Sequence, residues 1–278
     1  MIGLSCALSG SALAQPAAQP AAPAAKKAAK KGKVAPPVKI DLAPTIAALT
    51  TGNNDAAAKA AEQLGTSADP AAHEALLDAL AFGLPPSVAM AAITALGMHP
   101  APPDVTALVR YASHHNSGVR SAALGALAMY PAAAARKALV GGLHDMNPAV
   151  RLAAGMAAAK GHAREAIEPL FELLSRSDES AAKSLAAMAD ADLARRIGEQ
   201  FGKVPEPMLA MTLGLILKRA DFGPDPARVD VVRAIGRIQD SSAVSALTDY
   251  IDATPKTPPR PSRQEAQKMV EARLGGGK

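Results

Sequence analysis

The sequence predicts an all-α protein, a right-handed α-solenoid of about seven helical hairpins, from three observations. Alanine occupies 66 of the 278 positions, aromatic residues make up only 3%, and one apolar pattern recurs every 31 residues. Alanine is the strongest intrinsic helix former, whereas strands are enriched in aromatic and β-branched residues. This composition therefore favours stacked helices over a β-sandwich or barrel.

Residues 1–14 contain an apolar stretch that ends in Ala12-Leu13-Ala14, a small-x-small cleavage pattern ahead of Gln15. This pattern is typical of a secretory signal peptide, here a truncated one because no basic residue precedes the apolar stretch. We expect Cys6, the only cysteine, to be removed with it. The expected location is the periplasm or cell envelope, and it is the cytoplasm if these residues are instead an alanine-rich disordered start.

Residues 15–40 are rich in Ala, Pro and Lys, a mixture that cannot bury a core and that predicts a disordered linker. Residues 1–40 hold six lysines and no acidic residue, whereas the remainder has 24 Lys and Arg against 25 Asp and Glu. The linker lysines either keep a spacer solvated, contact an anionic envelope surface, or bind nucleic acid if the chain is cytoplasmic. The clustered lysines are Lys26, Lys27, Lys30, Lys31 and Lys33.

Residues 41–274 repeat with a period of about 31, because Val88, Val119 and Val150 begin three similar segments. Apolar or small residues follow each valine at the spacing of one helix face. Second amphipathic stretches near residues 104, 135 and 163 lie between these segments. Each unit is thus a helical hairpin that is too small to be stable alone, so neighbouring units stack and share a continuous core.

The repeats resemble the HEAT-repeat family, especially its short bacterial form found in bilin lyases. Pro226–Leu247 carries the fullest match, through Val232, Arg233, Gly236, Asp240 and Leu247. A second element, Asn-Pro-x-Val-Arg, is complete at residues 147–151 and partial at 116–120.

The resemblance implies a hydrogen-bonded ladder between successive units, built from an arginine and a turn Asp or Asn. The residues that it assigns to the ladder are Asn116, Arg120, Asn147 and Arg151. Ala89 and Ala182 stand at the equivalent positions of the flanking units, so at most two rungs are expected.

Three segments depart from the repeat. Residues 203–225 break its spacing through either a lost helix or an inserted loop. The proline-rich residues 255–261 predict a long turn, and residues 262–274 predict a polar closing helix of the kind that caps a solenoid. Residues 275–278 are expected to form a disordered tail.

Signals for catalysis are incomplete. His73-Glu74 begins a zinc-protease motif, but Leu77 stands where the second histidine is required. Ser180 and Lys183 match S-x-x-K without the companion motifs of the penicillin-binding enzymes. We therefore predict no enzyme activity, no cofactor and no metal. The recurring turn residues His114, His115, His144, Asp145, Arg176, Asp178 and Glu179 are interpreted as a solvated ridge, since a metal site would need them to converge.

The predicted function is a non-enzymatic scaffold that is exported to the bacterial cell envelope and binds a protein or peptide on its concave face. Flexible methionine side chains suit adaptable binding surfaces. The residues proposed to contact the partner are Met90, Leu152, Met156, Met208 and Met211. The alternatives are a cytoplasmic nucleic-acid-associated protein that uses the lysine-rich tail and, less favoured, an enzyme on a HEAT-like fold. The near-neutral body makes nucleic acid an unfavoured partner.

Overall fold

A computed structural model describes residues 41–275, and their regular elements are helical. The signal peptide, the linker, Cys6 and the five clustered lysines lie outside the described residues, and so do residues 276–278. Within residues 41–275, none of the helices is both long and apolar enough to cross a lipid bilayer.

Fifteen α-helices and one short 3-10 helix make up this part of the chain. They are α1 (Leu42–Ala48), α2 (Asn54–Gly65), α3 (Pro70–Phe82), α4 (Pro86–Leu96), α5 (Asp104–Tyr111), α6 (Ser117–Leu127), α7 (Ala133–Gly142), α8 (Pro148–Lys160), η1 (Arg164–Ala166), α9 (Ile167–Ser175), α10 (Glu179–Met188), α11 (Ala191–Gly198), α12 (Glu206–Lys218), α13 (Asp225–Gly236), α14 (Ser241–Ala253) and α15 (Pro261–Gly275).

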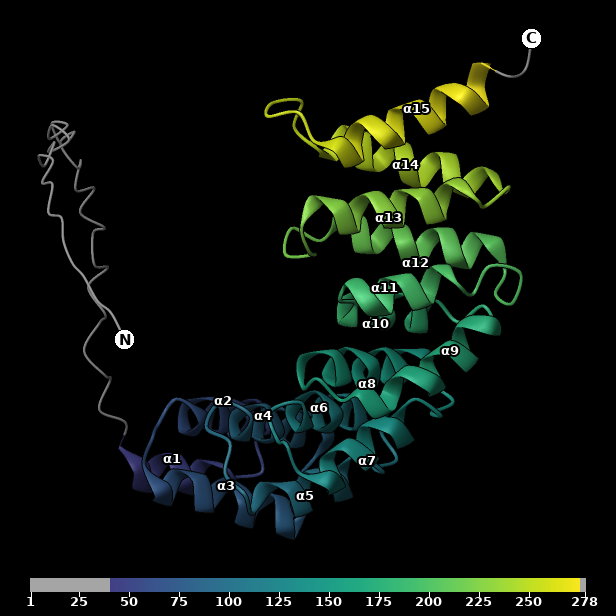
Figure 1. Cartoon of the computed structure of the whole chain (residues 1–278). Helices are drawn as coiled ribbons and strands as arrows, with labels where there is room; N and C mark the ends of the chain where they lie inside the picture. Colours follow the sequence, from purple (N-terminus) through teal and green to yellow (C-terminus); the bar gives the residue numbers. More distant parts are fainter. Residues whose placement is uncertain (1–40, 276–278) are drawn as a thin grey trace, which may run out of the picture. The chain divides into compact units, whose positions relative to one another are not determined.

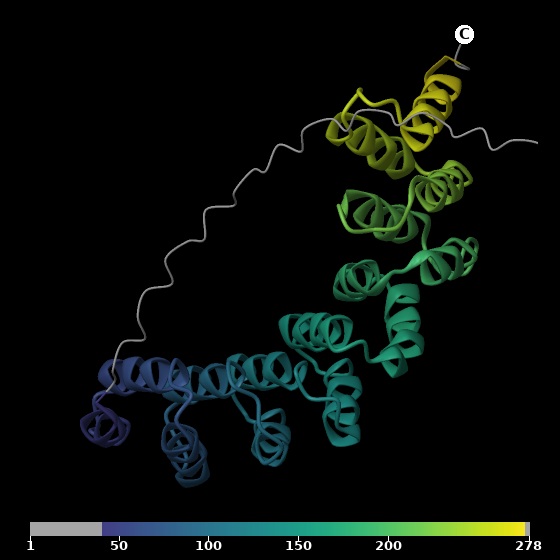
Figure 2. The same cartoon turned by 60° about the vertical axis from the view of Figure 1, so that its left-hand side comes forward.

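The helices form seven antiparallel hairpins, α1–α2 to α13–α14, followed by the single helix α15 (Figure 1). Each even-numbered helix packs directly against the next one, from α2 to α14. Figure 2 shows these even-numbered helices along the inner side of the stack, with the odd-numbered helices outside. The predicted all-α solenoid is confirmed.

Local sequence starts the helices where the repeat predicts. Asn53, Asp69, Asn116, Asn147 and Asp178 each stand immediately before a helix, and their side chains accept hydrogen bonds from backbone N–H groups of its first turn. These groups have no partner within the helix, so such a cap contributes roughly 1 kcal/mol. The period of 31 is therefore also the period of the helix starts at residues 116, 147 and 178.

The core runs continuously through the stack. Val88, Val119 and Val150, which define the repeat, are at most 1% exposed. Small residues bring the even-numbered helices close together. A Cβ atom added to Gly65 of α2 would lie 2.5 Å from the Cβ of Ala95 in α4, and one added to Gly155 of α8 would lie 2.6 Å from the Cβ of Ser184 in α10. The abundant alanine and glycine thus set a short distance between neighbouring helices.

The irregular segment 203–225 keeps the architecture. It holds α12, which packs between α10 and α14 in the inner row, so no helix is lost. The spacing changes because only two residues separate α10 from α11, so that α12 begins 27 residues after the start of α10, and because α13 has 12 residues, so that α14 begins 35 residues after the start of α12. At the end of the stack, α15 packs against both α13 and α14, as a closing helix does.

Candidate interaction groove at the end of an arginine ladder

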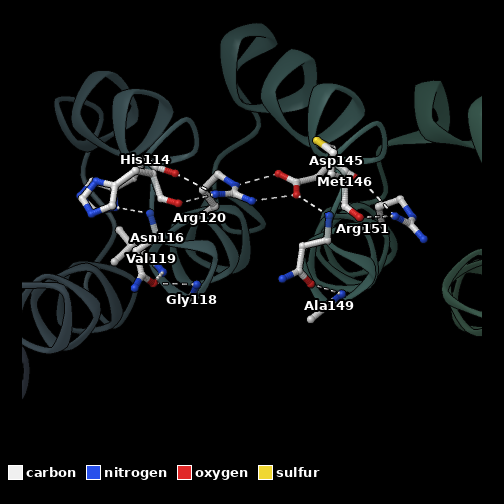
Figure 3. Close-up of polar contacts among 11 residues, drawn as sticks. His114, Asn116, Gly118, Val119, Arg120, Asp145, Met146, Ala149 and Arg151 are labelled. Carbon is white, nitrogen blue, oxygen red and sulfur yellow. Dashed lines mark hydrogen bonds and ion pairs between the residues drawn. The ribbon is translucent and has the colours of Figure 1, made fainter.

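Two arginines connect successive hairpins on the edge where the odd-numbered helices turn into the even-numbered ones (Figure 3). Arg120 in α6 donates from Nε to Asp145 Oδ2 at 2.7 Å and from Nη2 to Asp145 Oδ1 at 2.8 Å. Its Nη1 donates to the carbonyl oxygens of His114 and His115, in the turn before α6. One guanidinium therefore joins its own turn to the turn of the next unit.

Arg151 in α8 repeats this arrangement one unit later. Its Nε donates to Asp178 Oδ2 at 2.5 Å, and its Nη1 donates to the carbonyl oxygens of Asp145 and Met146. The two arginines and the two aspartates have side chains that are only 10–20% exposed. Such partly buried, charge-assisted bonds are stronger than exposed ion pairs.

The structure gives the asparagines a different role from the one that the resemblance implied. Asn116 accepts from the backbone N–H groups of Gly118 and Val119, and Asn147 accepts from that of Ala149. Both asparagines cap the helix of their own unit, and the acceptors that connect units are Asp145 and Asp178. We call these two pairs, Arg120–Asp145 and Arg151–Asp178, the arginine ladder.

The ladder perturbs the ionisation of its members. The hydrogen bonds from Arg120 hold the pKa of Asp145 below its usual value, and the same bonds raise the pKa of Arg120. Burial acts to raise the pKa of Asp178, but hydrogen bonds from Ser180 and the pairing with Arg151 outweigh it, and the net pKa is lowered. Both carboxylates are therefore ionised and neutralised by their arginines at neutral pH.

The ladder ends beside a groove of about 730 Å³ between the first turns of α8 and α10. We call it the ladder-end groove. Apolar side chains of Leu143, Leu152 and Leu173 line it together with Arg151, Arg176 and Lys183. Leu152 is the one predicted partner-binding residue that lies in this groove.

The other predicted partner-binding residues are spread along the inner row. Met90, Met208 and Met211 are half-buried and pack against the core. Met90 Sδ contacts the first turn of α6 beside Gly118. Met156 is 44% exposed on α8. The structure thus brings Leu152 and Met156 to one exposed helix face, and it uses the three other methionines largely for packing between units.

A buried polar cluster in the first repeats was not anticipated. Asp104 in α5 is fully buried, and its Oδ1 lies 2.7 Å from His73 Nε2 in α3. Its Oδ2 accepts from the Ala101 backbone N–H and from the Tyr130 hydroxyl. Burial, together with the hydrogen bond to Asp104, raises the pKa of Tyr130. The sequence held a signal for this cluster, since His73 and Asp104 are separated by 31 residues, one repeat.

The cluster does not assemble a catalytic set. His73 lines a pocket of about 510 Å³ with Glu74 and His99, but within residues 41–275 its only side-chain hydrogen bond is to Asp104. An oriented histidine acts in covalent catalysis when it activates a neighbouring nucleophile, and none is bonded to it here. No group of three or more His, Cys, Asp or Glu in the described part of the chain is arranged to hold a metal ion.

Stacked hairpins joined by an arginine ladder define a helical-repeat protein. A family model of HEAT repeats matches residues 42–128 and again residues 74–145. Residues 42–145 are therefore similar to HEAT repeats, the family that the sequence resemblance indicated.

Solved structures of several proteins are similar to the chain. The complex of CpcE and CpcF of phycocyanin lyase from Nostoc sp. PCC7120 has 18% identity and a TM-score of 0.46, over 88% of this chain and 98% of the other. The karyopherin Kap121p has 15% identity and a TM-score of 0.47, over 83% of this chain and 29% of its own. An engineered protein has 22% identity and a TM-score of 0.35, over 86% and 98%. A search of curated proteins finds no match.

Proposed function

We propose that this HEAT-repeat chain is a non-enzymatic interaction scaffold that binds a protein or peptide on the inner row of even-numbered helices. The proposal rests on one observation, which is that α4, α6 and α8 together present a side that faces solvent. These three helices have neighbours on their other sides, so this side alone is open to a partner.

The open side has an unusual chemistry for a protein surface, because it carries almost no charge. Its exposed or half-buried positions recur at the repeat period and are filled by small or flexible side chains. They are Met90, Ala91 and Thr94 on α4, Ser121, Ala122 and Gly125 on α6, and Leu152, Ala153 and Met156 on α8. Contiguous apolar surface of this kind marks interaction sites on soluble proteins.

A photo-cross-linking experiment tests this proposal. A benzophenone amino acid replaces Gly125 on the inner row or, as the matched control, Lys137 on the outer helix α7, in cells that produce the full chain. We expect one defined protein to be cross-linked from position 125 and not from 137, and the purified pair to bind again with affinity reduced by Met156→Glu. Equal cross-linking from both positions, or turnover of a small molecule by the purified chain, would contradict the proposal.

Export to the cell envelope is part of the same proposal and rests on the sequence of residues 1–14. Mass spectrometry of the N-terminus of the protein recovered from cells tests it. A chain that begins at Gln15 is the expected result, and a chain that begins at Met1 would place the scaffold in the cytoplasm.

A further inference from the structure

We infer that the ladder-end groove binds a carboxylate of the partner, supplied by an Asp or Glu that lies next to an apolar residue in an extended peptide. The inference rests on the proposed scaffold function and names the chemistry of its partner. It is carried by Arg176, whose side chain has no acidic partner in the described residues, by an unused N–H group of Arg151, by the weakly paired Lys183, and by the apolar surface beside them.

The repeat places different residues at equivalent turn positions in three successive units. His114, Asp145 and Arg176 are each separated by 31 residues, so a cation stands in the third unit where an acid accepts the ladder bond in the second. The arginine column ends at the same step, because the residue after Arg120 and Arg151 is the buried Ala182. Arg176 is exposed, and its side chain makes no hydrogen bond or ion pair with other residues of the described range 41–275.

Arg151 also has a nitrogen, Nη2, that donates no hydrogen bond within residues 41–275. Arg120 uses Nε, Nη1 and Nη2, and it holds both oxygens of Asp145. Arg151 uses only Nε and Nη1, and within residues 41–275 its Nη2 has no acceptor, because the second oxygen of Asp178 accepts from Ser180. A planar guanidinium with an unused N–H suits a carboxylate oxygen.

Lys183 is the third cation at the groove. Its Nζ lies 3.4 Å from Glu179 Oε2, and the two side chains are 45% and 67% exposed. Exposed pairs of this type within one helix contribute little to stability, so the ammonium can readily exchange this partner for another. Asp145 and Asp178 are already neutralised by the ladder and Glu179 is offset by Lys183, so Arg176 leaves the groove with a net positive charge.

The apolar part of the groove selects a peptide rather than a simple anion. Leu152 and Leu173 line the groove beside these cations, with Pro148 and Ala149 at the start of α8. An apolar side chain next to the carboxylate is removed from water there, which adds to the affinity for such a peptide. Leu152 lines the groove and also belongs to the open side of α8, so such a peptide would continue onto that side.

The test measures fluorescence anisotropy of two fluorescein-labelled ten-residue peptides with the full chain. In one peptide Glu alternates with Leu, and in the other Lys alternates with Leu. We expect the acidic peptide to bind at least tenfold more tightly, with affinity that falls as salt is raised. The double variant Arg176→Gln, Lys183→Gln should lose at least tenfold in affinity for the acidic peptide. Lys160→Gln, at the other end of α8, is the matched control and should bind like the wild type.

Circular dichroism melting shows whether each variant is folded, and Leu152→Ala reports the apolar contact independently of charge. Equal binding of the two peptides, or unchanged binding by the folded double variant, would overturn the inference. The outcome is separable from the scaffold proposal, because cross-linking from position 125 does not depend on these cations. A partner that is captured there and is insensitive to Arg176→Gln, Lys183→Gln would leave the scaffold in place and exclude the carboxylate site.

Discussion

The guanidinium of Arg120 holds both carboxylate oxygens of Asp145, which lies 25 residues further along the chain in the turn of the next hairpin. The same guanidinium binds two carbonyl oxygens of its own turn. The ladder therefore holds the turns of neighbouring units in fixed positions relative to each other. It also holds in place the turn residues that line the groove at its end.

Loss of a ladder arginine should destabilise the solenoid. Arg120→Ala leaves Asp145 partly buried without its main partner, and we expect the free energy of unfolding to fall by about 2–3 kcal/mol. Urea denaturation followed by circular dichroism measures the change. The matched control is Arg136→Ala, which removes an exposed pair with Glu165 and should cost less than about 0.5 kcal/mol. Equal effects of the two variants would refute a structural role for the ladder.

Two glycines should respond to alanine in opposite directions. A Cβ atom at Gly155 of α8 would overlap Ser184 of α10, so Gly155→Ala should lower the free energy of unfolding by about 1–3 kcal/mol. Gly125 in the middle of α6 has no atom within 4 Å of an added Cβ, and Gly125→Ala should raise stability by about 0.5–1 kcal/mol. Thermal melts of both variants test the prediction, and partial rescue of Gly155→Ala by Ser184→Gly would identify the contact. A stabilising Gly155→Ala would show that α8 and α10 are further apart than described.

The buried carboxylate of Asp104 should be among the most sensitive polar positions. Asp104→Ala removes the acceptor of His73, Ala101 and Tyr130 together, and we expect a loss of about 3 kcal/mol. Tyr130→Phe removes one of these bonds and should cost about 1–2 kcal/mol. Chemical denaturation of the two single variants and of the double variant measures their coupling. Additive losses would mean that Asp104 and Tyr130 do not act as one unit.

Lowering the pH should reduce the free energy of unfolding in two steps, through groups in the turns that the arginine ladder joins. Burial and the neighbouring His115 lower the pKa of His114, so the unfolded chain takes up a proton first, and stability should fall as the pH drops below about 6.5. The pKa values of Asp145 and Asp178 are also lowered, so their contribution is complete above about pH 4 and is lost as the pH falls through their folded values. Urea midpoints between pH 8 and 3 measure both steps. His114→Gln should reduce the upper step alone, and an unchanged upper step in this variant would contradict the assignment.

Much of the fold follows from the period of the sequence. Val88, Val119 and Val150 predicted three inner helices, and the structure buries all three side chains. The spacing failed at residues 203–225, because a repeat length read from the sequence does not show which connection or outer helix has changed in length. The inner helix α12 is present there, since its apolar residues still have α10 and α14 to pack against.

The site was harder to predict, because its contacts connect units across 25 to 31 residues. Arg120 and Arg151 were assigned to a ladder from the family resemblance, but the choice between Asn147 and Asp145 as acceptor depends on which side chain caps α8. In the next unit one residue serves both purposes, because Asp178 Oδ1 accepts from the Ser180 backbone N–H while its Oδ2 accepts from Arg151. Arg176 was already named among the recurring turn residues of the ridge, and the 31-residue period shows that it is a cation at a position where the preceding unit carries the acid Asp145.

The glycine and alanine contacts between inner helices have a further consequence. At each contact the two helices are so close that one extra methyl group would push them apart. Such a displacement between two helices would tilt every hairpin that follows relative to those that precede it. Three contacts of this kind are Gly65 with Ala95, Gly155 with Ser184, and Gly214 with Ala246. Point mutations at these positions can therefore retune the spacing of distant partner contacts without altering any residue that touches the partner.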